Sequence, residues 1–312
     1  MEQQIITIVG GSGFLGRYVV RLLARAGYTV RVIARNPNAA SALKTAGDVG
    51  QIVLVSGNLA KPESLKGKFE DSYAIINLVG ILYEGGSQRF SKIHAQSAEK
   101  LAQMAKEAGV KRFIHVSALG VDKAAGSQYA RTKMLGETAI LAAFPAATIL
   151  RPSVMFGPED NFFNQFAAMA SISPVLPLIG GGHTRFQPVY VGDVAQAIEA
   201  CLAHEATQGK TFELGGPQTY SFREILQYIN KQLRVDRCLL SLPFAAASLM
   251  GTLGELLPRP PLTRDQVKLL KTDNVVSVDS LGFAQLGIEP QNIDAIVPTY
   301  LARYNYKPEV AA

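Results

Sequence analysis

A glycine-rich loop near the start of the 312-residue chain is the segment whose residue types and spacing point most directly to chemistry. Gly10, Gly13 and Gly16 directly follow the apolar run Ile5–Val9. Glycines at this spacing permit a tight turn, let the backbone approach a pyrophosphate and allow close helix packing. Free N–H groups at the start of the helix would face the phosphates, whereas the alternative is a purely structural glycine turn. The loop predicts a dinucleotide site formed by Gly10, Gly11, Ser12, Gly13, Phe14, Leu15 and Gly16.

The end of the second apolar run bears on which dinucleotide this would be. An acidic residue there would bind the ribose diol of NAD. The sequence instead ends this run with Ala34-Arg35, and Arg17 lies just past the glycine loop. Two guanidinium groups suit the additional 2′-phosphate of NADP, so we expect NADP(H) rather than NAD(H). The alternative is that both arginines are solvated surface residues.

Tyr129 and Lys133 form a second set of residues with chemical potential. They stand four residues apart, one helical turn, which places both side chains on one face of a helix. A lysine ammonium there would lower the tyrosine pKa and hold a ribose, and the phenol would act as a general acid or base. The alternative is a partly buried tyrosine beside a surface lysine.

Ser117 is the third catalytic candidate, since a hydroxyl after the fifth strand usually orients the substrate carbonyl in this fold. The local sequence aligns that catalytic position with Ala118 instead, which leaves the chemistry in doubt. His115 is expected in the core, and Asp193 is expected to cap a helix. His94, His183 and His204 are scattered and predict no metal site.

The elements that would position these residues follow from hydrophobic patterning. Longer amphipathic segments at Phe14–Ala26, Phe90–Ala108 and Tyr129–Ala143 separate short apolar runs. This alternation predicts an α/β fold with a Rossmann-type, doubly wound parallel sheet. The expected strands are Ile5–Val9, Thr29–Ala34, Ile52–Val55, Ala74–Val79, Phe113–Val116 and Thr148–Leu150.

The alternation stops after Arg151-Pro152, where a Pro/Gly-rich stretch begins. A helix over Asp193–Ala203 and a strand over Thr211–Leu214 are expected to return to the sheet. A capping box at Ser221 and Glu224 predicts a further helix start. We therefore expect a cofactor-binding domain of residues 1–155, rejoined by about 186–215, and a smaller, mostly helical domain of residues 156–185 and 216–312.

In open α/β sheets a ligand lies at the C-terminal edges of the strands, here between the two expected domains. Further cofactor contacts are therefore assigned to residues at or beyond the ends of the third, fourth and sixth expected strands. These residues are Asn58, Leu59, Val79, Gly80 and Pro152.

Composition limits the class of protein. Lys and Arg number 31 and Asp and Glu 25, giving a net charge of +6 that is spread along the chain without a basic cluster. No nucleic-acid partner is expected from such a pattern. Cys201 and Cys238 suit neither a disulfide framework nor a zinc site, which indicates a reducing compartment. The N-terminal residues resemble neither a signal nor a transit peptide, so a cytoplasmic protein is expected.

Several segments resemble a known family. VGGSGFLGR (Val9–Arg17), YARTKMLGE (Tyr129–Glu137) and RPSVMFGP (Arg151–Pro158) occur widely among extended and atypical short-chain dehydrogenase/reductases. QPVYVGDV (Gln187–Val194) and the more particular LTRDQVKLLKTDNV (Leu262–Val275) are similar to the nucleotide-binding accessory subunit of respiratory complex I, the alpha-subcomplex subunit 9 family, and its bacterial relatives. The resemblance runs from near residue 5 to about residue 305.

This resemblance implies a tightly held NADPH, bound by the loop glycines with Arg17 and Arg35, and with Tyr129 and Lys133 near the nicotinamide ribose. It also implies partners among the subunits of complex I, at the junction of the peripheral arm and the membrane, and little turnover. A bacterial setting at the cytoplasmic face of the inner membrane fits best. Some bacterial relatives are free-standing.

The uncharged stretch Cys238–Gly254 is too short to span a bilayer, where about 20 residues are needed. Leu249, Leu253 and Leu256 fall there and just beyond at helical spacing, with Met250 and Leu257, beside Phe244. Packing in the core is one explanation. A surface that contacts a membrane or a partner through about residues 238–257 is the other.

Three functions remain open at this stage. The first is an NADP(H)-binding accessory or assembly subunit of NADH:quinone oxidoreductase, which accommodates Ala118. The second is a free-standing NADP-dependent reductase or epimerase that uses Tyr129 and Lys133 on a sugar, steroid, isoprenoid or quinone-like substrate. The third is a regulator that senses the redox state of NADP(H).

Overall fold

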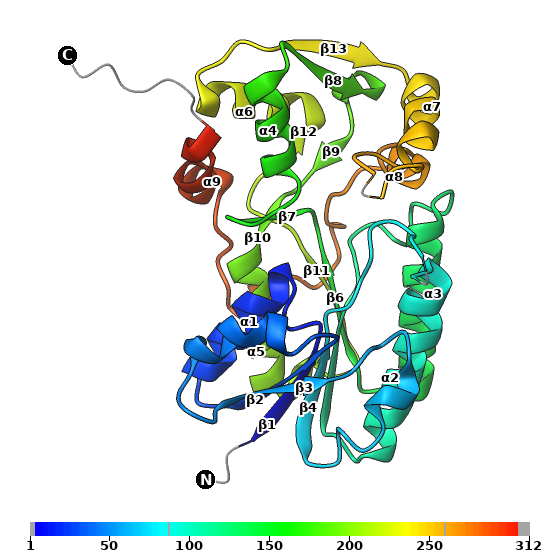
Figure 1. The fold of residues 1–312 in the computed structure, drawn as a ribbon, viewed down its shortest axis with the longest axis vertical. Helices are drawn as coiled ribbons and strands as arrows, with labels where there is room; N and C mark the ends of the chain where they lie inside the picture. Colours follow the sequence, from blue (N-terminus) through cyan, green and yellow to red (C-terminus); the bar gives the residue numbers. More distant parts are fainter. Residues whose placement is uncertain (1–3, 87, 259, 305–312) are drawn as a thin grey trace, which may run out of the picture.

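A parallel sheet forms the larger part of the molecule, and a second part with several helices covers one end of it (Figure 1). The computed structural model describes residues 4–86, 88–258 and 260–304. Within these residues the main sheet has seven parallel strands in the order β3-β2-β1-β4-β5-β6-β11. They are β1 (Ile5–Val9), β2 (Thr29–Ala34), β3 (Ile52–Ser56), β4 (Ser72–Asn77), β5 (Arg112–Val116), β6 (Thr148–Pro152) and β11 (Thr211–Leu214).

Helices cover both faces of this sheet. α1 (Phe14–Arg25) and α5 (Val191–Ala203) pack on one face, and α2 (Ser97–Glu107) and α3 (Gln128–Ala143) pack on the other (Figure 1). Strand side chains alternate between two hydrophobic cores, so that Ile114 faces α1 and α5 while Phe113 faces α2 and α3. Burial on both faces explains why these strands are continuous apolar runs.

The second part has its own hydrophobic core, formed mainly by α4, α6, α9 and the strand β8. Its helices are α4 (Phe163–Ile172), α6 (Phe222–Leu233), α7 (Phe244–Gly254), α8 (Arg264–Leu269) and α9 (Ile293–Leu301). Short strand pairs join or flank it, namely β8 (Val175–Ile179) with β13 (Cys238–Leu242), β9 (Arg185–Phe186) with β12 (Tyr220–Ser221), and β7 (Met155–Phe156) with β10 (Val189–Tyr190).

The expected doubly wound parallel sheet is confirmed, and the capping box of Ser221 and Glu224 starts α6 as predicted. The expectation for the smaller part was incomplete, because the parallel pair β8–β13 was not foreseen. Its strands are 5 residues each and lie far apart in the sequence, and β8 contains Pro177. Such segments show no local strand signal.

The helix expected over Phe90–Ala108 begins as a π-helix over Ser91–Gln96 before continuing as α2. A close contact with α3 accompanies this widening. A Cβ on Gly136 of α3 would lie 1.9 Å from the carbonyl oxygen of His94. Short π-helical turns of this kind occur often at functional sites.

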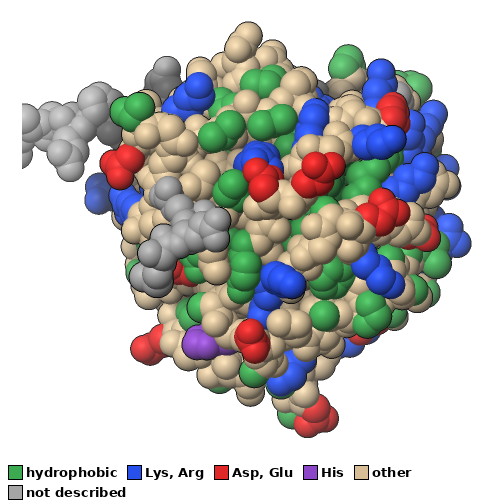
Figure 2. Space-filling view, turned by 90° about the horizontal axis from the view of Figure 1, so that it is seen from below, with side chains coloured by type: hydrophobic (Ala, Val, Ile, Leu, Met, Phe, Trp, Pro, Cys, Tyr) green, Lys and Arg blue, Asp and Glu red, His purple; other side chains and the backbone are tan. Residues whose placement is uncertain are grey.

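The end of the molecule farthest from the second part carries interspersed Lys, Arg, Asp and Glu side chains with hydrophobic groups between them (Figure 2). In the described residues, no helix has the length and apolarity required to span a bilayer. Among those same residues, no cluster of three or more His, Cys, Asp or Glu side chains could hold a metal ion.

Candidate functional site

The glycine loop between β1 and α1 has a geometry that excludes larger residues. Gly10 has a φ of +92°, and a Cβ on Gly16 would lie 2.5 Å from the carbonyl oxygen of Gly10. Gly13 precedes the first turn of α1, where no side chain caps the helix and no acidic residue is present. The loop therefore offers backbone N–H groups and the positive end of the helix dipole to an anion.

The strand-end residues predicted to contact a cofactor lie at the same edge of the sheet. Val79 lies just after β4. Its side chain is close to the glycine loop, because a Cβ on Gly10 would lie 3.1 Å from Val79 Cγ2. Asn58 follows β3, and its Oδ1 accepts a hydrogen bond from Ala60 N. Leu59 is buried, and Pro152 ends β6.

The two arginines expected near the ribose lie on the same side of the fold as the glycine loop. Arg17 is half-buried in the first turns of α1, and Arg35 is exposed directly after β2. Neither guanidinium has an ion pair within the described ranges. Residues 34–36 read Ala-Arg-Asn, so no carboxylate ends this strand.

Lys133 is a buried residue, which excludes the surface-lysine alternative. Its side chain is 3% exposed, and Nζ donates a hydrogen bond of 3.0 Å to the carbonyl oxygen of Val116. Nζ also lies beside Gly80, 3.3 Å from where a Cβ would be. Burial lowers the pKa of Lys133 to about 8.

The expected lowering of the tyrosine pKa is wrong for this state of the protein. Burial raises the pKa of Tyr129 to about 12. The phenol is therefore protonated at neutral pH and is a weaker acid than free tyrosine.

His94 and Phe90 surround Tyr129 in a way that sequence analysis missed. The ring centroids of His94 and Tyr129 are 5.2 Å apart, and Phe90 stacks on His94. His94 Nε2 accepts a hydrogen bond from Ile81 N, and burial lowers the pKa of His94 to about 2. The imidazole is neutral, and its ring packs against the ring of Tyr129. The four-residue spacing of Phe90 and His94 was the available sequence signal.

Ser117 and Ala118 directly follow β5 (Arg112–Val116). Ser117 is buried, and its Oγ has no hydrogen-bond partner among the described residues. Ala118 is half-buried and offers no hydroxyl. His115 is buried as expected, with its Nδ1 3.1 Å from Asn77 Nδ2.

Asp193 does not cap α5, contrary to the expectation. The helix begins at Val191, so Asp193 lies within its first turn. Its Oδ2 instead accepts a hydrogen bond of 2.7 Å from Gln291 N, and burial raises the pKa of Asp193 to about 6. Asp193 therefore links α5 to the segment that leads into α9.

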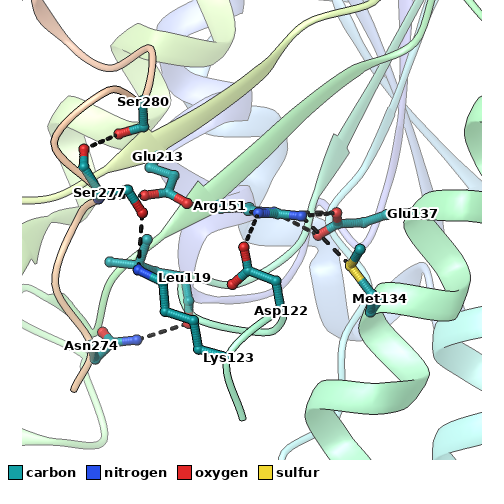
Figure 3. A network of polar contacts seen from close by, with 10 residues as sticks. All are labelled: Leu119, Asp122, Lys123, Met134, Glu137, Arg151, Glu213, Asn274, Ser277 and Ser280. Atoms are coloured by element: carbon teal, nitrogen blue, oxygen red, sulfur yellow. Dashed lines mark hydrogen bonds and ion pairs between the residues drawn. The ribbon is translucent and has the colours of Figure 1, made fainter. Parts of the chain in front are cut away.

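Arg151 on β6 holds a network of acidic residues beside the site (Figure 3). Its guanidinium pairs with Glu137 at 2.7 Å, Asp122 at 3.1 Å and Glu213 at 3.7 Å. In the same region Asn274 Nδ2 donates to the carbonyl oxygen of Leu119. This network fixes the loop between β5 and α3 against the C-terminal segment.

α7 (Phe244–Gly254) exposes most of its large apolar residues, whereas Phe244 at its start is half-buried and packs against the core of the second part. Ala247 and Gly251 face inward, and a Cβ on Gly251 would lie 2.8 Å from Arg264 N. Core packing, one of the two explanations, therefore holds for Phe244 but not for the exposed leucines and Met250. The apolar α7 surface consists of Leu249, Met250, Leu253, Leu256 and Leu257, which are 66, 53, 62, 81 and 54% exposed.

The fold and the loop define a Rossmann-type nucleotide-dependent protein, and comparisons with known proteins agree. The model of the NAD dependent epimerase/dehydratase family matches residues 6–215. A solved dTDP-glucose 4,6-dehydratase from Streptomyces venezuelae, with NAD bound, shares the fold at a TM-score of 0.74 and 20% identity, covering 96% of each chain.

Curated relatives extend the similarity through the second part of the molecule. The mitochondrial NADH dehydrogenase [ubiquinone] 1 alpha subcomplex subunit 9 of Arabidopsis thaliana is 37% identical, over 96% of this chain and 78% of its own length. The mitochondrial NADH-ubiquinone oxidoreductase 40 kDa subunit of Neurospora crassa is 33% identical, over 96% of this chain and 79% of its own. The chain belongs to the NAD dependent epimerase/dehydratase family and, within it, to the alpha subcomplex subunit 9 family.

Proposed function

We propose that this protein is an NADP(H)-binding accessory or assembly subunit of NADH:quinone oxidoreductase, with a structural role and little turnover. The observation that carries the proposal is the similarity to complex I subunits along 96% of the chain. The half-buried Ala118, where a catalytic hydroxyl would be needed, supports a structural role.

NADP(H) is the cofactor that the residues suit. The loop of Gly10, Gly13 and Gly16 would hold the pyrophosphate, because its backbone leaves no room for side chains. Arg17 and Arg35 would bind the 2′-phosphate, and Tyr129 and Lys133 the nicotinamide ribose. When bound, the nicotinamide would supply or accept a hydride. Ser117, whose buried Oγ has no hydrogen-bond partner among the described residues, would offer a hydroxyl directly after β5.

The two parts of the molecule would have different roles. We propose that residues 1–155, rejoined by about 186–215, bind the cofactor. Residues 156–185 and 216–312 would form the smaller unit that contacts partners or substrate. Clusters of buried residues on each side of this division support it, except that Phe283 and Leu286 are buried in the core of the cofactor-binding part.

The apolar α7 surface is the proposed contact with the membrane, at the junction with the peripheral arm. Exposed leucines suit the bilayer interface, and the exposed Arg264 and Lys268 of the neighbouring α8 suit anionic headgroups. The free cysteines Cys201 and Cys238 suit a reducing compartment. We therefore place the protein at the cytoplasmic face of a bacterial inner membrane.

Native separation of gently solubilised membranes tests the proposal. The protein should migrate with NADH:quinone oxidoreductase activity, and this co-migration should survive moderate salt because apolar contacts are not screened. Recovery in the soluble fraction alone, from cells grown with an active respiratory chain, would contradict a stable subunit role.

A free-standing reductase or epimerase is the second candidate, favoured by the pairing of Tyr129 with a buried Lys133 at the sheet edge. Tyr129→Phe is expected to abolish any NADPH-dependent turnover of hydrophobic carbonyl substrates while NADPH binding is retained. Turnover that survives this substitution would eliminate Tyr129 as the catalytic acid.

A further inference from the structure

The N-terminus of α3, the helix that carries Tyr129 and Lys133, is capped by a carboxylate from the second part of the molecule. Asp265 accepts hydrogen bonds from Gln128 N at 2.7 Å, Tyr129 N at 2.9 Å and the Ser127 hydroxyl at 2.7 Å. The donors and Asp265 are at least 136 residues apart in sequence. A carboxylate at this end of a 16-residue helix satisfies backbone donors and opposes the helix dipole.

Asp265 belongs to α8, and α8 is packed directly against α7. A Cβ on Gly254 of α7 would lie 2.7 Å from the carbonyl oxygen of Leu262. Glu255 Oε1 accepts a hydrogen bond of 2.9 Å from Arg264 N. These contacts pack the end of α7 closely against the start of α8, so a ligand that restrains α7 would also restrain α8.

The same short helix touches both hydrophobic regions beside it. Val267 is buried in the core of the second part, whereas Leu269 packs with Val121, Ala124 and Ala130 at the start of α3. In Figure 1, α8 lies between α7 above and the upper end of α3 below. A displacement of α7 would therefore be transmitted to the first turn of α3.

We propose that Asp265 is a positioning residue that caps α3 from α8, so that dinucleotide binding at Tyr129 and Lys133 is energetically coupled to occupation of the apolar α7 surface. The proposal rests on the function proposed above. Its physical basis is that α8 is shared by the two sites. Asp265 of α8 fixes the first turn of α3, and a contact at α7 restrains α8. By linkage, each ligand strengthens the other by the same factor.

The coupling can be measured with the full-length protein and two defined probes. NADPH affinity is followed by the fluorescence of the reduced nicotinamide, with and without saturating vesicles of equimolar phosphatidylcholine and phosphatidylglycerol. The ratio of the two dissociation constants is expected to be about five or more. Vesicle affinity measured with and without NADPH should change by the same ratio.

Variants assign this ratio to Asp265. Asp265→Asn keeps one accepting oxygen and turns the other into an amide group that faces a backbone N–H. It should weaken NADPH binding about tenfold without vesicles and bring the ratio close to one. Glu255→Gln, at an exposed contact between α7 and α8, should reduce the ratio while NADPH affinity without vesicles is retained. The matched control Asp236→Asn, at an exposed acid outside these contacts, should behave as the wild type.

The outcomes separate the coupling from the proposed function. A wild-type ratio of one, with both NADPH and vesicles bound, would overturn the coupling and leave the function standing. If both Asp265→Asn and Glu255→Gln retained the wild-type ratio, neither residue would take part in the coupling. A merely structural cap would lower thermal stability in Asp265→Asn without changing the ratio. Binding of neither probe by the wild type would contradict the proposed function itself.

Discussion

Lys133 shows how a single residue depends on what occupies the site. Its ammonium is buried next to Val116 and Gly80, and burial lowers its pKa from 10.5 to about 8. The charge is costly in the protein alone, and an anionic ligand close by would offset that cost. This energetic conflict is typical of binding sites.

The stability of the cofactor-free protein should therefore depend on pH through Lys133. Because its folded pKa is lowered, the unfolded chain binds more protons between about pH 8 and 10.5, and the contribution of this group to stability rises with pH in that window. The wild type should gain about 2 kcal/mol relative to Lys133→Met between about pH 7 and pH 10. Urea unfolding of both proteins at each pH measures this, and a constant difference would contradict the lowered pKa.

At the residue scale, the glycine loop, Tyr129 and Lys133 were predictable because short motifs act within one strand–turn–helix unit. The burial of Lys133 against the Val116 carbonyl was not predictable, because every residue has a backbone carbonyl and the sequence does not show which one a lysine contacts. The cap by Asp265 was also not predictable, because sequence periodicity reports one helix face and not which distant carboxylate meets it.

At the scale of elements, α1 is held close to its loop by the absence of a side chain at Gly16. A Cβ there would lie 2.5 Å from the carbonyl oxygen of Gly10 and 2.6 Å from the backbone of Gly11. Gly16→Ala is expected to push α1 outward, lower stability by about 1–3 kcal/mol and abolish NADPH binding. Gly126→Ala is the control, since nothing lies within 4 Å of its Cβ position. Equal NADPH affinity in both variants would count against the loop as the phosphate site.

Arg151 ties β6 to α3 and β11, and its removal should be costly. Glu137 and Glu213 have side chains only 4 and 7% exposed, so Arg151→Met would leave two buried carboxylates without this partner. We expect a loss of about 3–5 kcal/mol, measured by urea unfolding. The double variant Arg151→Met, Glu137→Met should be more stable than Arg151→Met alone. A double variant less stable than the single one would argue against charge burial as the cause.

The bounds of the first six strands of the main sheet could be predicted to within two residues, because burial on both faces makes each strand a short apolar run between residues that break strands. The π-helix at Ser91–Gln96 could not, since it accompanies a contact between His94 and Gly136 on another helix. The pairing of β8 with β13 also arises from tertiary packing rather than from local preference.

At the scale of the whole molecule, the apolar α7 surface is the feature that indicates contact with a membrane, because contiguous exposed apolar side chains mark interaction surfaces. The double variant Leu253→Asp, Leu256→Asp should fold normally, because both side chains are more than half exposed. Its affinity for vesicles should fall about a hundredfold, as the burial of two leucines is lost. Val278→Asp, at a fully exposed valine outside α7, is the control. Unchanged vesicle binding in the double variant would exclude this surface as the contact.

The chain passes several times between the core beneath α1 and α5 and the core of the second part, which has a consequence for how the protein unfolds. Along the sequence, residues of the first of these cores are Leu150, Val189, Leu214 and Phe283. Residues of the second core lie between and after them, namely Phe156, Phe186, Phe222, Val267 and Ile293. A protease cut in any one connection would leave the others in place. The nicked chain should therefore stay together under native conditions and release fragments only in denaturant, and heating should melt both cores in one cooperative transition.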